Sequence, residues 1–384
     1  MKTSTDRILT THVGSLPRSQ AVTDIVFGRE QGTVEDQSAA DQVIADAVAE
    51  VVHRQAELGI DVVSDGEMSK ISYATYIKDR ITGFGGDSHR EPAQDLLDFP
   101  GVLKKREQAG TRSGARPPRC IGEIAVKDMQ PLKTDLANLQ RGVEQIKVAE
   151  AFMNAASPGV IALFQPNDYY PDHEAYLEAL GEAMRAEYEG IVDAGFLLQI
   201  DAPDIGMGRH TIFRDKSDDE YLRLATLHIE VLNHSLRNIA ADRVRLHVCW
   251  GNYEGPHHLD APMELVLPVA LQANAQALLF ESSNPRHAHE WTVFRDAAIP
   301  DDKILVPGVI DSTTNFIEHP QLVAERIQRF ADIVGRERVM AGTDCGFATF
   351  AGFGAVDADV VYAKLGALVE GARLATARLW ATAA

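Results

Sequence analysis

The chain has few cysteines and no long apolar segment. Three cysteines in 384 residues are too few for a disulfide framework. The N-terminus lacks the apolar stretch of a signal peptide, and no run reaches the roughly 18 apolar residues that a membrane-spanning helix needs. We therefore expect a protein of the reducing cytoplasm, where thiolates are available to bind a metal ion.

Positive charge is also scarce. The 37 Lys and Arg residues against 56 Asp and Glu residues give a net charge of −19 at pH 7. Such a charge repels the phosphates of nucleic acids and anionic lipids. We expect neither nucleic acid nor membrane among the partners, and the sequence leaves open whether the chain forms a homo-oligomer.

Short β-rich runs alternate with longer amphipathic stretches, a pattern typical of repeated βα units around a parallel sheet. This predicts an α/β fold, a (β/α)8 TIM barrel. The expected strands are 8–15, 60–66, 119–126, 159–164, 197–202, 244–250, 277–282, 304–310 and 338–344. The expected helices are 37–58, 134–155, 174–194, 218–240, 261–275, 319–334 and 358–380.

Nine expected strands are one too many for an eight-stranded barrel. The extra one is 119–126, because it follows a polar segment rich in charge, Gly and Pro. We therefore interpret 83–126 as a loop excursion that ends in a hairpin. Neither a fixed-period repeat nor a linker divides the chain, which predicts one domain over 1–384.

Candidate metal ligands follow three of the expected strands. His247 and Cys249 are two residues apart, so on a strand both side chains leave the same face. Glu281 ends the apolar run "ALLFE", and Cys345 follows the strand that ends in "GTD". Side chains at the C-terminal ends of barrel strands meet at the mouth of the barrel. One His, two Cys and one Glu there form the ligand set that zinc prefers.

Several motifs together resemble the cobalamin-independent methionine synthase family. They are "TTHVGSLPRS" near the start, "SDGEM" at 64–68, "LQIDAPD" at 198–204, "LHVCWG", "FESS", "PGVID" and "GTDCGF". The resemblance extends in order over almost the whole chain and corresponds to the C-terminal catalytic barrel of that family. It implies a zinc ion held by His247, Cys249, Glu281 and Cys345.

The resemblance also implies a small-molecule thiol and an alkyl donor as substrates, with methyl transfer to a homocysteine-type thiol bound to the zinc as a thiolate. A metal ion favours the thiolate, which is the nucleophilic form of a thiol. Motif by motif, Ser15, Glu67 and Asp201 resemble the residues that hold the amino acid part of homocysteine. Glu67 and Asp201 would be the catalytic carboxylates.

Three positions depart from the family pattern. The family's "IDEPA" motif is Ile200-Asp201-Ala202-Pro203-Asp204 here, so the acid directly after Asp201 is missing. Thr313 stands where methionine synthases carry a proton-donating His, and Phe164 stands where a Trp would stack on a pteridine. These departures argue against a folate donor and leave open which group acts as general acid.

Two alternatives stay open, and a third fails. An epoxyalkane–coenzyme M transferase would use the same zinc to open an epoxide, and Arg18, Lys70, Arg209 and Arg286 could bind the coenzyme's sulfonate. A non-catalytic barrel with a structural zinc is disfavoured because structural sites are usually Cys-rich and closed. A zinc-free uroporphyrinogen-decarboxylase-like barrel does not explain the His-x-Cys pair or Cys345. Cys120 has no partner in the sequence and is expected to be structural.

Overall fold

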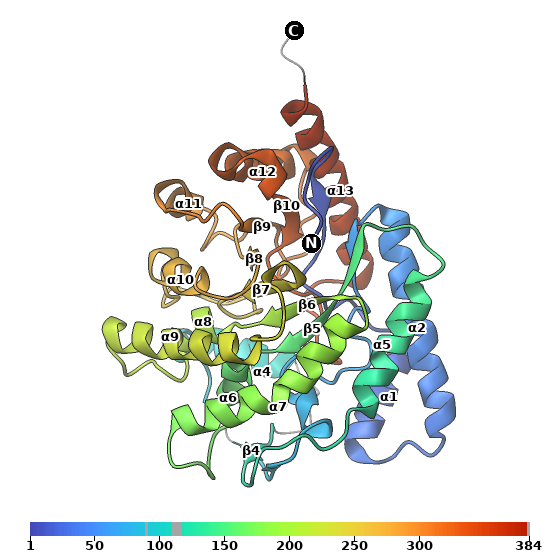
Figure 1. The fold of residues 1–384 in the computed structure, drawn as a ribbon, viewed down its shortest axis with the longest axis vertical. Helices are drawn as coiled ribbons and strands as arrows, with labels where there is room; N and C mark the ends of the chain where they lie inside the picture. The colour runs from blue at the N-terminus through green and yellow to red at the C-terminus, as the bar shows by residue number, and fades with distance from the viewer. Residues whose placement is uncertain (89–90, 110–116, 382–384) are drawn as a thin grey trace.

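Eight parallel strands form a nearly closed barrel in the computed structural model, which describes residues 1–88, 91–109 and 117–381 (Figure 1). The strands are β1 (Leu9–Thr10), β2 (Val62–Val63), β5 (Glu150–Ala156), β6 (Leu197–Asp201), β7 (Val244–Val248), β8 (Ala277–Phe280), β9 (Ile304–Ile310) and β10 (Met340–Thr343). Their order is β1-β10-β9-β8-β7-β6-β5-β2. The backbone N–H of Asp61 donates to the carbonyl oxygen of Thr10 (3.1 Å), which links the two edges. The predicted (β/α)8 barrel is confirmed.

A helix follows each barrel strand. These helices are α2 (Gln37–Leu58), α5 (Gln130–Val143), α7 (His173–Asp193), α9 (Asp218–Ser235), α10 (Met263–Ala270), α11 (Trp291–Asp296), α12 (Pro320–Val334) and α13 (Ala358–Leu379). Further elements are α1 (Gln20–Gln31), α6 (Pro158–Phe164), α8 (Asp204–Met207) and the 3-10 turns Thr75–Asp79, Gly208–His210, Ala241–Arg243 and Arg336–Arg338. Local sequence sets the helix ends. The side chain of Asp36 accepts the N–H of Ala39 (2.9 Å) at the start of α2, and Gly59 ends it with a positive φ of 90°.

One predicted strand is wrong. Residues 159–164 form helix α6, and the barrel strand is β5, which lies at the end of the helix expected over 134–155. Ser157 caps α6 by accepting the N–H of Val160 (2.9 Å), and Pro158 occupies the first turn, where its missing N–H costs nothing. A short apolar run does not by itself distinguish a strand from a buried helix.

The excursion after β2 includes the predicted hairpin. Strands β3 (Phe84–Gly85) and β4 (Arg119–Cys120) pair in antiparallel fashion, so 119–126 does not contribute a barrel strand. Between them lie helices α3 (Gln94–Leu97) and α4 (Pro100–Ala109). Residues 89–90 and 110–116 of the excursion lie outside the described residues.

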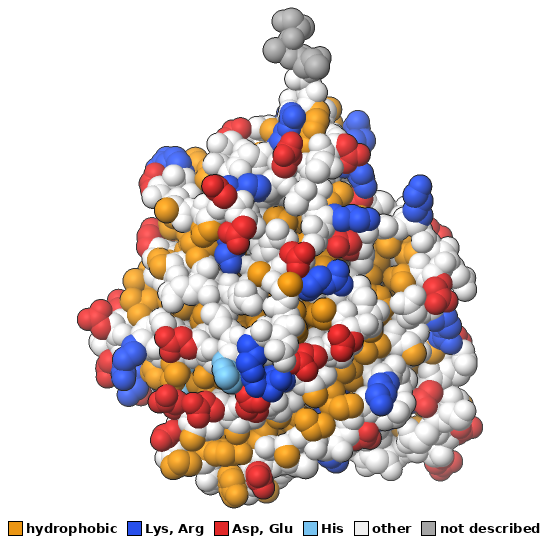
Figure 2. All heavy atoms as spheres, viewed as in Figure 1, with side chains coloured by type: hydrophobic (Ala, Val, Ile, Leu, Met, Phe, Trp, Pro, Cys, Tyr) orange, Lys and Arg blue, Asp and Glu red, His pale blue; other side chains and the backbone are white. Residues whose placement is uncertain are grey.

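The core consists of apolar side chains packed between the sheet and the surrounding helices. On the face drawn in Figure 2, Lys and Arg are interspersed with Asp and Glu, although the chain as a whole is acidic. In residues 1–88, 91–109 and 117–381, none of the helices is both long enough and apolar enough to cross a membrane.

Candidate functional site

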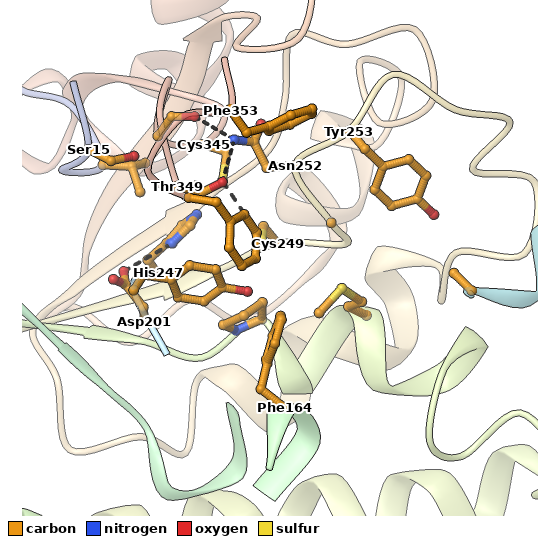
Figure 3. Close-up of a pocket in the computed structure, with 18 of the residues that line it drawn as sticks. Ser15, Phe164, Asp201, His247, Cys249, Asn252, Tyr253, Cys345, Thr349 and Phe353 are labelled. Carbon is orange, nitrogen blue, oxygen red and sulfur yellow. Dashed lines mark hydrogen bonds and ion pairs between the residues drawn. The ribbon is translucent and has the colours of Figure 1, made fainter. Parts of the chain in front are cut away.

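A cavity of about 430 Å³ opens at the C-terminal ends of the barrel strands (Figure 3). This is the end at which barrel enzymes build their active sites, and the size is that of a small-molecule site. The predicted residues Ser15, Glu67, Asp201, His247, Cys249 and Cys345 all line it. The barrel therefore brings together side chains from five separate parts of the sequence.

His247, Cys249 and Cys345 form a potential metal-binding group. Their ligand atoms lie within 4.8 Å of one another, and the two sulfur atoms are 4.0 Å apart. The His247 Nε2 atom is buried without a hydrogen-bond partner, so this ring nitrogen is free to bind a metal. Contact with the Cys249 thiol and burial raise the pKa of Cys345 well above its usual value. Ionisation of Cys345 is therefore disfavoured unless a positive charge lies nearby.

Asp201 holds the other nitrogen of the His247 ring. His247 Nδ1 lies 3.2 Å from Asp201 Oδ1, and the side-chain amides of Asn154 (2.9 Å) and Gln199 (3.0 Å) donate to the same carboxylate. Burial opposes the charged imidazole, but the bond with Asp201 and the nearby Cys249 outweigh it and raise the pKa of His247 to about 9. A carboxylate on the far nitrogen fixes the ring orientation, as it does for most histidine ligands of metals.

Glu281 does not belong to this group. Its Oε1 atom accepts the backbone N–H of Trp250 (2.9 Å), and its Oε2 atom accepts the side-chain amide of Asn284 (2.6 Å). Burial raises the pKa of this carboxyl. Glu281 therefore lies beside the strand that carries His247 and Cys249 but is held by protein donors, and its role as a ligand stays a prediction.

Asp344, next to Cys345, positions the loop that follows Glu281, a role that the sequence did not predict. Its carboxylate accepts the backbone N–H groups of Ser282 (2.8 Å), Ser283 (2.9 Å) and Asn284 (2.9 Å). Gly308 gives this carboxylate room, because a Cβ there would collide with Asp344. Asp344 thereby connects the end of β10 with the end of β8.

Ser15 lies against the segment that carries Cys345. Its Oγ atom accepts the backbone N–H of Ala348 (3.2 Å), and its carbonyl accepts that of Phe347 (2.9 Å). Gly346 permits this approach, since a Cβ at that position would overlap with Oγ of Ser15. The "VGSLPR" and "GTDCGF" motifs therefore meet in one wall of the cavity (Figure 3).

Glu67 combines backbone strain with a perturbed carboxyl group. Its φ is 57°, a left-handed conformation that is unusual for a residue other than glycine. Arg18 and the side chain of Asp65 hold this turn by bonding to the backbone carbonyl (2.6 Å) and N–H (2.9 Å) of Glu67. Burial, more than the nearby Asp201, raises the pKa of Glu67 to about 7, against the effect of Lys70. Its Oε2 atom is buried without a hydrogen-bond partner, so it is free to bind a ligand.

Aromatic side chains form a cluster in the lining of the cavity. The rings of Tyr73, Phe164 and Phe350 lie 5.5 to 6.1 Å apart by their centroids. In Figure 3, Tyr253 lies on the opposite side of the cavity from Ser15 and Asp201. Among these residues the sequence predicted only Phe164. Tyr253 and Phe350 follow the "HVCWG" and "GTDCGF" motifs by a few residues, and that proximity was the available signal.

The four cations that could bind a sulfonate in the alternative reaction do not line the cavity. Arg18 and Lys70 donate to backbone carbonyls, Arg209 pairs with Asp218, and Arg286 contacts the carbonyl of His258. The structure therefore gives no support to this role for any of the four. The cavity instead has Arg106, which lies in the polar excursion and which the sequence did not suggest.

The residues that depart from the family pattern have structural partners. Thr313 does not line the cavity, and its N–H and hydroxyl donate to Asp311 (3.0 and 2.9 Å). Asp204 is buried between Ser157 (2.7 Å) and His228 (2.8 Å). Cys120 also lies outside the cavity, where its thiol contacts the carbonyl of Gly122 (3.5 Å).

Comparison with known proteins supports the resemblance. The family model described as the catalytic domain of cobalamin-independent synthase matches residues 8–92 and 125–372. A methionine synthase of Sulfolobus acidocaldarius is 26% identical over 339 residues, which cover 88% of this chain and 85% of the relative. A 2-hydroxypropyl-CoM lyase of Xanthobacter autotrophicus is 27% identical over 370 residues, which cover 88% and 86%.

A solved structure agrees in fold. The B12-independent methionine synthase of a Shewanella species, in complex with selenomethionine, has a TM-score of 0.75 and 18% identity and covers 98% of this chain and 100% of its own. At that identity the likeness concerns the barrel alone, whereas the family model matches most of the sequence. This chain is an enzyme and belongs to the cobalamin-independent synthase catalytic domain family.

Proposed function

We propose that this chain, acting as one barrel domain, is a zinc-dependent thiol S-alkyltransferase that transfers a methyl group to a homocysteine-type thiol. The observation that carries the proposal is the group of His247, Cys249 and Cys345 in a cavity that also contains two carboxylates, Glu67 and Asp201. The methionine synthase relatives favour the same chemistry.

The donor atoms fit zinc. Two thiol sulfurs and one imidazole nitrogen are ligands that zinc prefers, and three protein ligands with a fourth position for water or substrate are typical of catalytic zinc. The buried, unpartnered Nε2 atom of His247 supports this assignment. When bound, zinc would supply the positive charge that deprotonates a substrate thiol at neutral pH.

The protein residues orient the reaction. Asp201 fixes the His247 ring through the bond to Nδ1, so Nε2 faces the two cysteines. Glu67 would accept the ammonium group of an amino acid, and its left-handed backbone and unpartnered Oε2 atom support this role. Ser15 and the backbone around Gly346 form the adjacent wall, which sets how closely the substrate approaches the ligands.

An epoxide-opening reaction with a sulfonated thiol is the second candidate. Two observations favour it: the match to the Xanthobacter relative, and Thr313, whose hydroxyl is bonded to Asp311 and cannot protonate a folate nitrogen in the cavity. Without a general acid, a poor leaving group loses roughly 10²–10⁴-fold in rate, while a strained epoxide loses less.

A matrix of acceptors and donors tests the proposal. The zinc-loaded protein is incubated with homocysteine or coenzyme M, each with methyl-tetrahydrofolate, methylcobalamin or a small epoxide, and the loss of thiol is followed. We expect loss of homocysteine with methylcobalamin and little with methyl-tetrahydrofolate. Loss of coenzyme M with the epoxide alone would favour the second candidate, and no loss in any pair would overturn both.

A further inference from the structure

Part of the cavity wall comes from a segment that the family model does not match. The sequence match to the family does not include residues 93–124. Nevertheless, Ala93, Leu96 and Arg106 from this segment line the cavity. The rest of the lining belongs to parts of the chain that the family model matches. Substrate differences between family members are therefore expected to arise at this wall.

The segment is fixed against the loop that follows Cys249. Asp95 is fully buried, and its Oδ2 atom accepts both the hydroxyl of Tyr253 (2.7 Å) and the backbone N–H of His257 (3.0 Å). A few residues further, Asp98 bonds to His258 (3.1 Å). These bonds give helices α3 and α4 a defined position over the outer half of the cavity.

Arg106 is held by this arrangement, and among the described residues most of its donors have no partner. Its guanidinium lies 4.8 Å from the centre of the Tyr253 ring, and its Nη1 atom makes a long contact of 3.5 Å with the carbonyl of Glu254. Among the described residues, no carboxylate lies within ion-pair distance of it. An arginine presents five N–H donors in a fork that matches a carboxylate or sulfonate. The position of the guanidinium over the Tyr253 ring is that of a cation–π contact, which restricts the movement of this fork.

The cavity is electrically asymmetric. Glu67 and Asp201 lie with the metal-binding group, whereas Tyr253, on which Arg106 stacks, lies on the opposite side (Figure 3). Glu91 also lines the cavity, but it is paired with Arg214. Within the described part of the lining, Arg106 is the one Lys or Arg side chain. A cation set opposite two carboxylates favours a ligand with a negative group at its outer end.

We infer that Arg106 is a specificity-determining residue that binds an anionic group, a carboxylate or a sulfonate, on the substrate occupying the outer half of the cavity. The aromatic side chains Tyr73, Phe164 and Phe350 cover the apolar part of that substrate between its anionic group and the reacting carbon. This inference rests on the proposed function only in placing the reacting thiol at His247, Cys249 and Cys345.

A pair of unreactive ligands tests the inference without turnover. Binding of 3-phenylpropanoate and of its neutral amide is measured by calorimetry on the full-length protein as purified. We expect the wild type to prefer the carboxylate by about tenfold or more, as charge-assisted hydrogen bonds allow. Arg106→Gln should bind the two ligands equally. Arg119→Gln is the matched control, because Arg119 belongs to the same segment but pairs with Asp168 away from the cavity.

Circular dichroism and thermal unfolding show whether Arg106→Gln folds. If it does not, Arg106→Met serves as the second variant, because it keeps a long side chain against Tyr253. A carboxylate preference that persists in a folded Arg106 variant, or is missing from the wild type, would overturn the inference. Because no thiol or alkyl donor is present, these outcomes are independent of whether the acceptor and donor matrix shows methyl transfer.

Discussion

The Nδ1 atom of His247 lies 3.2 Å from Oδ1 of Asp201, while the opposite nitrogen of the ring is buried and has no hydrogen-bond partner. Asp201 resembles a residue that holds the substrate, but this contact gives it a second task, the orientation of the ring of His247, which we propose as a metal ligand. The two tasks have different consequences when the carboxylate is removed.

We expect Asp201→Asn to weaken metal binding by about 10–100-fold, the usual effect of removing a partner of a histidine ligand. Competition with a chromogenic chelator measures the change in affinity. Asp204→Asn is the control, because Asp204 is also buried but bonds to Ser157 and His228 instead of His247. Equal metal affinity in the Asp201 variant and the wild type would limit the role of Asp201 to substrate binding.

Substituting the cysteines inside and outside the cavity tests which of them bind the metal. Cys249→Ser and Cys345→Ser should each abolish both metal content and activity, because a serine hydroxyl does not ionise to replace a thiolate ligand. Cys120→Ser should keep both, since Cys120 is buried outside the cavity. Elemental analysis measures the metal content of the three variants. Activity of the wild type after exhaustive chelation would exclude a role for the metal. Applied to Glu281→Gln, the same analysis shows whether that carboxylate contributes.

The pKa of Glu67 near 7 predicts a pH-dependent affinity for aminothiols. Below this pH the carboxyl gains a proton and no longer attracts an ammonium group, so KM for homocysteine should rise as the pH falls from 8 to 6. The des-amino analogue 4-mercaptobutanoate should show no such rise. Glu67→Gln should have a high KM for homocysteine at every pH, and a wild-type KM in this variant would argue against the ammonium contact.

His12 predicts how stability depends on pH. Burial lowers its pKa from 6.5 to about 4, although Nε2 bonds to Gln55 (2.7 Å). Between these values the unfolded chain binds more protons than the folded one, so the free energy of unfolding falls as the pH drops from 6.5 to 4. The loss from this group is on the order of 3 kcal/mol. Urea unfolding over this range should show a shallower loss for His12→Asn than for the exposed control His289→Asn.

The sequence predicted most barrel strands and most long helices closely, but it misplaced strand β5 and extended the preceding helix over it. Helix α2 was predicted as 37–58, and these are its observed bounds, with Asp36 capping its start and Gly59 ending it. Strand β5 was missed because "EAFMNAA" lacks the β-branched residues that favour strands, while the apolar run in α6 resembled one. The expected site residues that reach the cavity follow barrel strands, whose ends must converge. The position of Arg106 in the cavity could not be predicted from the sequence, because it depends on how Asp95 fixes a polar segment to a distant loop.

The antiparallel pair β3–β4 places the two ends of the excursion side by side, with Phe84 opposite Cys120 and Gly85 opposite Arg119. A chain that leaves and returns at one point can change in length without moving the barrel strands, and the entropy of closing a loop grows only slowly with its length. Insertions and replacements are therefore tolerated between these two strands. The segment between β3 and β4 can therefore be replaced in protein engineering. A segment from another member of the family would change the outer wall of the cavity and leave His247, Cys249 and Cys345 unchanged.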